Sequence, residues 1–426
     1  MDFLEDSLTV YVDRCELRQG ETVQVYREGK QSEETQNRYK KITTALGGGY
    51  LEQIIDNLNA LDLSVLPSEC KRLLRCLVDS VTSEVGRALV GLTFLQLTIK
   101  SIAPEQCVRL HKGSGKGGSS FSWTDGISMR TLDKDYSAPF LRKHGLLNLN
   151  RDGVFMTRSL AENYPFTRLY KARMRGAFNE WLDIVDRLEA GIMPPKQGLV
   201  YLISLLKNRT EAFRRLADAT IAKARTKVFS SLEEATEFMT RFFNITDYSA
   251  RAFEVVIHSF MQAATETAWI NYDLVPISQM RSANKKHGNV GDIELTEGGR
   301  IIEAWDAKYG KPYLRDELEE LRDKILLASN DLRTVGFIVD DKIDRRCDVV
   351  KRVEEIVAET DVELKLFSFN EWIKYKTQNI GQEQARLLAS HWLTAVAESL
   401  GQKRRALAPI DEPCDGWLRD LERILD

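Results

Sequence analysis

Two aspartates and a lysine near residue 300 have the types and spacing that a metal-dependent phosphodiester hydrolase needs. Between residues 291 and 308 the chain reads Gly-Asp-Ile-Glu-Leu, then Thr-Glu-Gly-Gly-Arg, then Ile-Ile-Glu-Ala-Trp-Asp-Ala-Lys. Because paired glycines can take positive φ at a tight turn, the pattern predicts a β-hairpin. Asp292 would lie on its first strand, and Asp306 and Lys308 would share one face of its second strand.

These side chains suit the hydrolysis of a phosphodiester bond. Two carboxylates can hold Mg²⁺, which activates water, neutralises charge in the transition state and assists the departing alkoxide. The ammonium of Lys308 could orient the attacking water, or the lysine could act as a general base if its pKa were depressed. The sequence leaves both roles open.

Neighbouring acids and chance occurrence leave further alternatives. Glu294 shares the strand face of Asp292 and is an alternative metal ligand. Glu303 has the opposite parity to Asp306 and is expected to point away. An Asp-X-Lys triplet also arises by chance in charged chains, where both side chains usually lie on a solvated strand edge. The segments that flank the hairpin therefore decide how much weight the triplet carries.

The flanking segments predict a regular succession of helices and strands. Residues 249–265 are rich in apolar side chains and predict a core helix, on which Glu254 could join the site, face solvent or pair with Arg251. Downstream, the patterns predict a helix over 314–328, a strand over 334–339, a helix over 345–359, a strand over 362–367 and a helix from 370. This alternation is typical of an α/β domain.

The motif and its flanks resemble the PD-(D/E)XK nuclease superfamily and, within it, the type II restriction endonucleases. Asp306, Ala307 and Lys308 match the second half of the motif completely. Gly291 and Asp292 match the first half, with glycine in place of proline. The superfamily resemblance covers residues 249–376. The stretch over residues 125–183 is similar to SacI-type restriction endonucleases, which would extend the resemblance over most of the chain.

The resemblance implies a fold, a cofactor and partners. It implies an α/β restriction-endonuclease-like αβββαβ catalytic core in the C-terminal half, beside a mostly helical N-terminal half. It implies Mg²⁺ held by Asp292, Asp306 and the Ala307 carbonyl, with Lys308 at the reaction centre and Glu254 matching the acid that many members carry on their first helix. The implied substrate is double-stranded DNA with a short specific sequence. A homodimer is expected because a palindromic site matches a protein dyad, and a cognate DNA methyltransferase is expected in the same system.

Three segments carry candidate DNA contacts. A glycine, serine and lysine-rich stretch over 109–123 predicts an exposed loop, which fails the Walker pattern but could close over phosphates. The basic material over 151–158 and 163–175 includes basic residues among aromatics on a predicted helix, which could contact DNA or form a plain solvated face. A basic loop precedes the Asp292 strand, where His287 could be a catalytic base or, as we expect, a phosphate contact. The candidates are Lys112, Lys116, Arg158, Arg168, Lys171, Arg175, Lys285, Lys286, His287 and Asn289.

Composition sets wider limits. The 426 residues carry a formal net charge of −3, which excludes a uniformly basic nucleic-acid coat but allows local basic patches. The six cysteines show no Cys-X-X-Cys pair and no zinc spacing, so they are expected to be reduced thiols of a cytoplasmic protein. We expect no signal peptide and no membrane span, and residues 89–102 predict a buried helix.

The chain divides by pattern into four expected regions. These are a helical N-terminal region over 1–105, a mostly helical DNA-recognition region with a basic loop over 106–246, the catalytic core over 247–380, and C-terminal helices over 381–426. The helices over 382–400 and 417–425 are candidate dimer surfaces. Two other functions stay open: another PD-(D/E)XK nuclease of DNA repair or a mobile element, and a catalytically inert DNA-binding protein.

Overall fold

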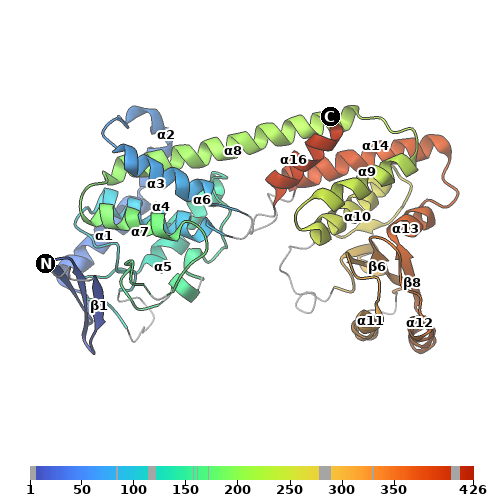
Figure 1. The fold of residues 1–426 in the computed structure, drawn as a ribbon, viewed down its shortest axis with the longest axis horizontal. Helices are drawn as coiled ribbons and strands as arrows, with labels where there is room; N and C mark the ends of the chain where they lie inside the picture. Colours follow the sequence, from blue (N-terminus) through green and yellow to red (C-terminus); the bar gives the residue numbers. More distant parts are fainter. Residues whose placement is uncertain are drawn as a thin grey trace. The chain divides into compact units, whose positions relative to one another are not determined.

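The computed structural model describes residues 6–82, 85–113, 121–156, 158–160, 162–170, 172–277, 289–328, 331–403 and 413–426. The protein is mixed α/β and about 56% helical. The described residues group into two compact units, unit 1 within residues 1–212 and unit 2 within residues 213–426 (Figure 1). The boundary falls inside α8 (Pro195–Thr226), and therefore inside the segment 106–246 that the sequence analysis treats as one region.

Unit 1 begins with an antiparallel sheet and continues as helices. In its described part, β1 (Ser7–Val10), β2 (Arg14–Gln19) and β3 (Thr22–Arg27) form a three-stranded meander. The helices are α1 (Glu33–Gly47), α2 (Tyr50–Asp56), α3 (Ser68–Asp79), α4 (Arg87–Ile102), α5 (Met129–Leu132), α6 (Ala138–Lys143), α7 (Phe178–Glu189) and the first part of α8. Short helical turns are η1 (Leu58–Ala60), η2 (Asp133–Ser137), η3 (Val154–Met156) and η4 (Arg158–Leu160).

Helix α4 is the buried centre of unit 1, which confirms the buried helix predicted over 89–102. Its threonines do not need outside partners, because the hydroxyls of Thr93 and Thr98 donate back to the carbonyls of Leu89 and Phe94, each at 2.8 Å. The predicted helical N-terminal region is wrong for β1 to β3. In β2 the buried Cys15 and Leu17 alternate with less buried residues, a period of two that is typical of strands.

Unit 2 contains a mixed sheet in the order β4-β5-β6-β7-β8 across its described residues. The strands are β4 (Asp273–Leu274), β5 (Ile293–Glu297), β6 (Arg300–Lys308), β7 (Thr334–Val339) and β8 (Glu363–Ser368). Neighbours are antiparallel from β4 to β6 and parallel from β6 to β8. The predicted hairpin is confirmed, with Gly298 and Gly299 at φ 59° and 79° between β5 and β6.

Helices cover both faces of this sheet. They are α9 (Leu232–Ile245), α10 (Ser249–Glu266), α11 (Arg315–Leu327), α12 (Cys347–Thr360), α13 (Phe369–Lys376), α14 (Gln382–Glu398) and α16 (Cys414–Leu425), with the helical turn η6 (Ser399–Lys403). Figure 1 shows α11 and α12 on the side of the sheet opposite to α10. Trp305 and Ile338 pack in the core on the α10 side, whereas Ala304 and Phe337 pack in the core beneath α11 and α12.

The pairing of β5 with β6 contains a β-bulge that sets which side chains reach which face. The register shifts between Leu295 and Thr296, which pair with Glu303 and Ile301, so Ile302 has no partner residue. As a result Ile302 packs on the α10 side like Trp305, although the two differ in parity. Beyond the bulge, β6 alternates regularly through the Asp-Ala-Lys triplet.

The C-terminal helices are part of the unit 2 core. Helix α14 packs against α10 and α9, and α16 packs against α9 and η6. Trp392 and Trp417 are fully buried, and their indole N–H groups donate to the carbonyls of Val256 and Asp247 at 2.9 and 2.7 Å. Their apolar faces are therefore used within the unit, and the pattern that suggested dimer surfaces here has this simpler explanation.

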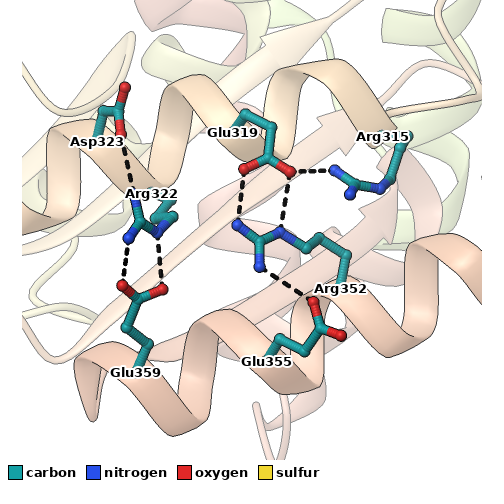
Figure 2. A network of polar contacts seen from close by, with 7 residues as sticks. All are labelled: Arg315, Glu319, Arg322, Asp323, Arg352, Glu355 and Glu359. Atoms are coloured by element: carbon teal, nitrogen blue, oxygen red, sulfur yellow. Dashed lines mark hydrogen bonds and ion pairs between the residues drawn. The ribbon is translucent and has the colours of Figure 1, made fainter.

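Helices α11 and α12 are joined by a network of exposed and half-exposed ion pairs (Figure 2). Arg352 of α12 donates to both oxygens of Glu319 on α11, at 2.7 and 3.0 Å, and also to Glu355 at 3.0 Å. Arg315 also pairs with Glu319. Hydrogen bonds from Arg352 and then Arg315 lower the pKa of the Glu319 carboxyl to about 2. Ion pairs between charged side chains thus join α11 to α12.

Replacing Arg352 with methionine is expected to lower the free energy of unfolding of unit 2 by about 1 kcal/mol, because the charged network is lost while most of the apolar stem is kept. Urea denaturation in 50 mM and in 1 M NaCl measures the effect, which should shrink in high salt. The control is Lys351→Met, because Lys351 is the residue before Arg352 in α12 and its side chain is more exposed. Equal stability of R352M and the parent in low salt would contradict this prediction.

Within the described residues, no helix combines the length and the apolar character that crossing a membrane requires.

Candidate active site

Asp292 and Asp306 lie opposite each other on neighbouring strands. Ile293, the first residue of β5, pairs with Trp305, so the preceding Asp292 stands across from Asp306. Gly291 explains why this approach is possible. A Cβ on Gly291 would lie 2.7 Å from the Trp305 carbonyl oxygen, so a larger residue there would push the two strands apart. Glycine at position 291 thus has a local steric reason.

The two carboxyl groups form a coupled, buried pair. The Ala307 N–H donates to Asp292 Oδ2 at 3.1 Å, and the side chains of Asp292 and Asp306 share a hydrogen bond. Burial, followed by the hydrogen bond and charge of Asp306, raises the pKa of Asp292 well above its ordinary value. Burial would also raise the pKa of Asp306, but the Asp292 hydrogen bond and nearby ammonium groups outweigh it and lower that pKa.

Lys308 joins this pair from the same face of β6. Its Nζ lies 3.1 Å from Asp306 Oδ2 and 3.0 Å from Glu317 Oε2. Burial lowers the pKa of Lys308, but the two carboxylates more than offset burial and raise it above the ordinary lysine value. In this arrangement Lys308 is an ammonium ion, which suits the orientation of water and the stabilisation of negative charge more than proton abstraction.

Helix α11 supplies two side chains that the sequence analysis missed. Glu317 pairs with Lys308, and the Lys324 Nζ lies 3.8 Å from Asp306 Oδ2. Both are mostly buried and lie two helical turns apart on α11, so both point at the sheet. Both lie three or four residues from Leu314, Leu318 or Leu321, a spacing that could have placed them on the same side of the helix as these leucines. Charged residues within an amphipathic helix usually face solvent, however.

Glu254 fits two of the expected alternatives at once. It forms an ion pair with the buried Arg251 one helical turn earlier on α10. Its charge also contributes to the raised pKa of Asp292, so Glu254 stands close to the aspartate pair. Of the roles weighed from sequence, the Arg251 pair is observed, and a contribution to metal binding stays a prediction.

The two other acids of the hairpin, Glu294 and Glu303, have partners of their own. Glu294 is buried, and its Oε1 accepts hydrogen bonds from the N–H groups of Val290 and Gly291 at 2.6 and 3.3 Å, which fixes the loop that leads to Asp292. Glu303 points to the opposite face, as its parity predicts, and accepts from Trp305 and Lys376. Glu294 thus holds the site in shape.

The donor set around Asp306 fits magnesium better than zinc. Among the described residues, no group of three or more His, Cys, Asp or Glu side chains is arranged to hold a metal ion. Mg²⁺ does not require such a group, because it keeps several waters and is commonly held by one or two carboxylates together with substrate phosphates. The buried Asp292 and Asp306 pair offers two close carboxyl groups whose mutual repulsion a divalent cation would relieve.

The loop ahead of Asp292 is described only in part. Lys285, Lys286 and His287 lie outside the described residues. Asn289 is half-buried and directly precedes Val290, whose N–H donates to Glu294. A contact of Asn289 with DNA stays a prediction.

The predicted basic helix over residues 163–175 is wrong. The described residues form turns and irregular chain there, where the Phe166 N–H donates to the carbonyl of Arg109 at 3.0 Å and the side chains of Phe166 and Tyr170 are buried in the unit 1 core. Arg168 pairs with Asp183 and lies 3.8 Å from Asp186, while Arg175 is exposed. Lys171 and the side chain of Arg158 lie outside what the structure describes.

The predicted exposed loop over residues 109–123 is wrong at both described ends. Arg109, His111 and Trp123 are buried. Lys112 is half-buried and donates to Asn163, and burial lowers its pKa. Lys116 lies outside the described residues. The glycine, serine and lysine composition signalled a loop but could not show that its flanks enter the core.

His111 makes unit 1 sensitive to acid. Its ring stacks on Phe155 and Phe166, and burial lowers its pKa to about 3. The unfolded chain binds a proton at His111 near pH 6.5 while the folded chain does not, so the stability present above pH 6.5 declines as the pH falls toward 3.

Replacing His111 with phenylalanine is expected to reduce this acid sensitivity by about 1.4 kcal/mol per pH unit between pH 6 and 4. Urea denaturation of unit 1 at pH 7, 6, 5 and 4 measures the slope. His391→Phe, at an exposed position of α14 in unit 2, is the control. An H111F slope equal to that of the parent would show that His111 is not buried in its neutral form.

Comparison with known proteins adds no family assignment: no protein-family model matches the chain, and no curated protein matches its sequence.

Proposed function

We propose that this protein is a Mg²⁺-dependent endonuclease that cuts double-stranded DNA at a short specific sequence, as a type II restriction endonuclease of the PD-(D/E)XK superfamily does. The observation that carries the proposal is the convergence of Asp292, Asp306 and Lys308 on one face of neighbouring strands. An exposed chance triplet would not show a buried carboxyl pair with an ammonium bound to it.

The order of elements supports the proposal. From α10 through β4, β5, β6 and α11 to β7, the chain follows the succession αβββαβ that the resemblance implies. Strands β4, β5 and β6 pair in antiparallel fashion. Strand β7 then pairs with β6 in parallel, after the crossover through α11. The catalytic triplet ends β6, where the parallel strands of the sheet also end.

The residues of the site have separable tasks in this proposal. Asp292, Asp306 and the Ala307 carbonyl would hold Mg²⁺, and Glu254 would serve a second cation position. Mg²⁺ supplies polarisation of the scissile phosphate and a bound water of lowered pKa. The Lys308 ammonium holds positive charge where negative charge grows on the phosphate, in a buried site where that charge is weakly screened.

The assembly and the biological partners follow from the same proposal. Symmetric cutting of both strands needs two active sites related by a dyad, so we expect a homodimer. A cell that carries such an enzyme must protect its own DNA, so we expect a cognate DNA methyltransferase in the same system.

Incubation of the purified protein with plasmid DNA and Mg²⁺ tests the proposed function. We expect a fixed set of fragments whose ends map to one short sequence. Degradation without sequence preference would favour a repair or mobile-element nuclease instead. Binding without cutting in Mg²⁺ or Mn²⁺ would favour a catalytically inert DNA-binding protein and would overturn the proposal.

A further inference from the structure

We infer that Glu317 of α11 is a positioning residue, which keeps the Lys308 ammonium at the scissile phosphate when a divalent cation occupies Asp306. The inference rests on the proposed function and adds to its site a residue that lies outside the Asp and Lys motif. It concerns the charge balance around Lys308.

Lys308 is shared between two carboxylates in the structure. Its Nζ lies 3.1 Å from Asp306 Oδ2 and 3.0 Å from Glu317 Oε2. The other oxygen of Glu317 accepts from Lys311 at 2.7 Å, so each oxygen of this carboxylate holds one lysine. Burial raises the pKa of Glu317, but hydrogen bonds from Lys311 and Lys308 outweigh burial and lower it, so Glu317 is a carboxylate here.

Metal binding would change the balance between these two contacts. A divalent cation held by Asp306 competes with the Lys308 ammonium for the same carboxylate and repels it. Glu317 is then the remaining negative charge in contact with Lys308. Without Glu317, the Phe337 ring, 5.8 Å from the Lys308 Nζ, would be a weak alternative attraction within the described part of the chain. Repulsion would then move the flexible lysine side chain away from the phosphate.

The fold fixes Glu317 for this task. It lies in the first turn of α11, where a negative charge is stabilised by the helix dipole. Leu318 and Leu321 are buried beneath the sheet and anchor the helix. The carboxylate therefore reaches Lys308 from a rigid element, and its position does not depend on the cation.

The matched pair Glu317→Gln and Glu319→Gln tests the inference. Both residues lie on α11 and both carboxylates bridge two cations, but Glu319 pairs with Arg315 and Arg352 away from the site (Figure 2). Single-turnover cleavage of plasmid DNA at saturating Mg²⁺ is expected to be about tenfold to a hundredfold slower in E317Q, because a misplaced catalytic group costs this much. E319Q should keep the parental rate.

Two further measurements separate positioning from a merely structural role. DNA affinity without divalent cation, and the helix content seen by circular dichroism, should be the same in E317Q and E319Q. In a Lys308→Ala background, E317Q should slow cleavage no further, because Glu317 acts through Lys308. An independent loss of rate in that background would overturn the inference.

The outcomes also separate this inference from the proposed function. An inactive parent overturns the nuclease proposal, and the inference falls with it. An active parent with a fully active E317Q overturns the inference alone and leaves the nuclease proposal standing. If E317Q and E319Q lost the same amount of rate, the cause would be a general effect of negative charge on α11. That result would also overturn the inference.

Discussion

Asparagine in place of Asp306 is expected to slow DNA cleavage by about a thousandfold or more, because the amide keeps the shape of the side chain but removes the negative charge. Asp306 is only 4% exposed, and three side chains interact with its carboxylate. They are Asp292, through a hydrogen bond, and the ammonium groups of Lys308 and Lys324. The variant would lose a metal ligand and would leave Lys308 held by Glu317 alone.

Plasmid cleavage by D306N is measured beside Asp331→Asn. Asp331 pairs with Arg300 near the hairpin turn, far along β6 from the triplet, so its variant should cut at the parental rate. Circular dichroism should show the same helix content in both variants. Parental cleavage by D306N would remove Asp306 from the active site, even if the protein proved to be a nuclease.

Alanine in place of Gly336 is expected to destabilise unit 2 by about 3 kcal/mol or more, because overpacking in a closely packed core has no low-cost relief. A Cβ on Gly336 would lie 2.2 Å from the Lys365 carbonyl oxygen of β8 and 2.6 Å from Cζ3 of Trp305. The indole of Trp305 lies over this glycine and also contacts Phe367 and Trp372. Because Trp305 directly precedes Asp306, displacing the indole would also shift the aspartate pair.

Urea denaturation of G336A measures this effect, with Gly416→Ala as the control. Gly416 lies in α16, and nothing lies within 4 Å of an added Cβ there. Since alanine is the better helix former, G416A should be more stable than the parent by about 0.5 to 1 kcal/mol. A G336A protein of parental stability would show that Trp305 does not pack on β7 in this way.

The C-terminal half of the fold was predictable because its local signals agree with one another. Strand β7 runs from Thr334 to Val339, as predicted, because an uninterrupted apolar run between helices predicts a buried parallel strand. The hairpin followed from Gly298 and Gly299, and the facing of Asp292 and Asp306 followed from strand parity. The bulge at Ile302 did not disturb that parity, because it lies before Glu303.

Two other errors share a physical cause: the amino-acid composition of a segment does not show which of its side chains are buried. The basic segment over 163–175 suggested a helix, but its described residues form turns, and the Phe166 N–H bonds to the distant carbonyl of Arg109. The helix over 314–328 was predicted from its apolar residues, which gave no role to Glu317 and Lys324, although both pair with charged residues of β6. In both cases tertiary contacts decided the outcome.

The location of a bound cation tests the central claim most directly. Crystals of the protein soaked in Mn²⁺ would show by anomalous scattering where a divalent metal binds. We expect a peak within about 2.3 Å of carboxylate oxygens of both Asp292 and Asp306, with the Lys308 ammonium turned toward Glu317. A protein that cuts DNA while its Mn²⁺ binds elsewhere, with both aspartates unligated, would contradict the account.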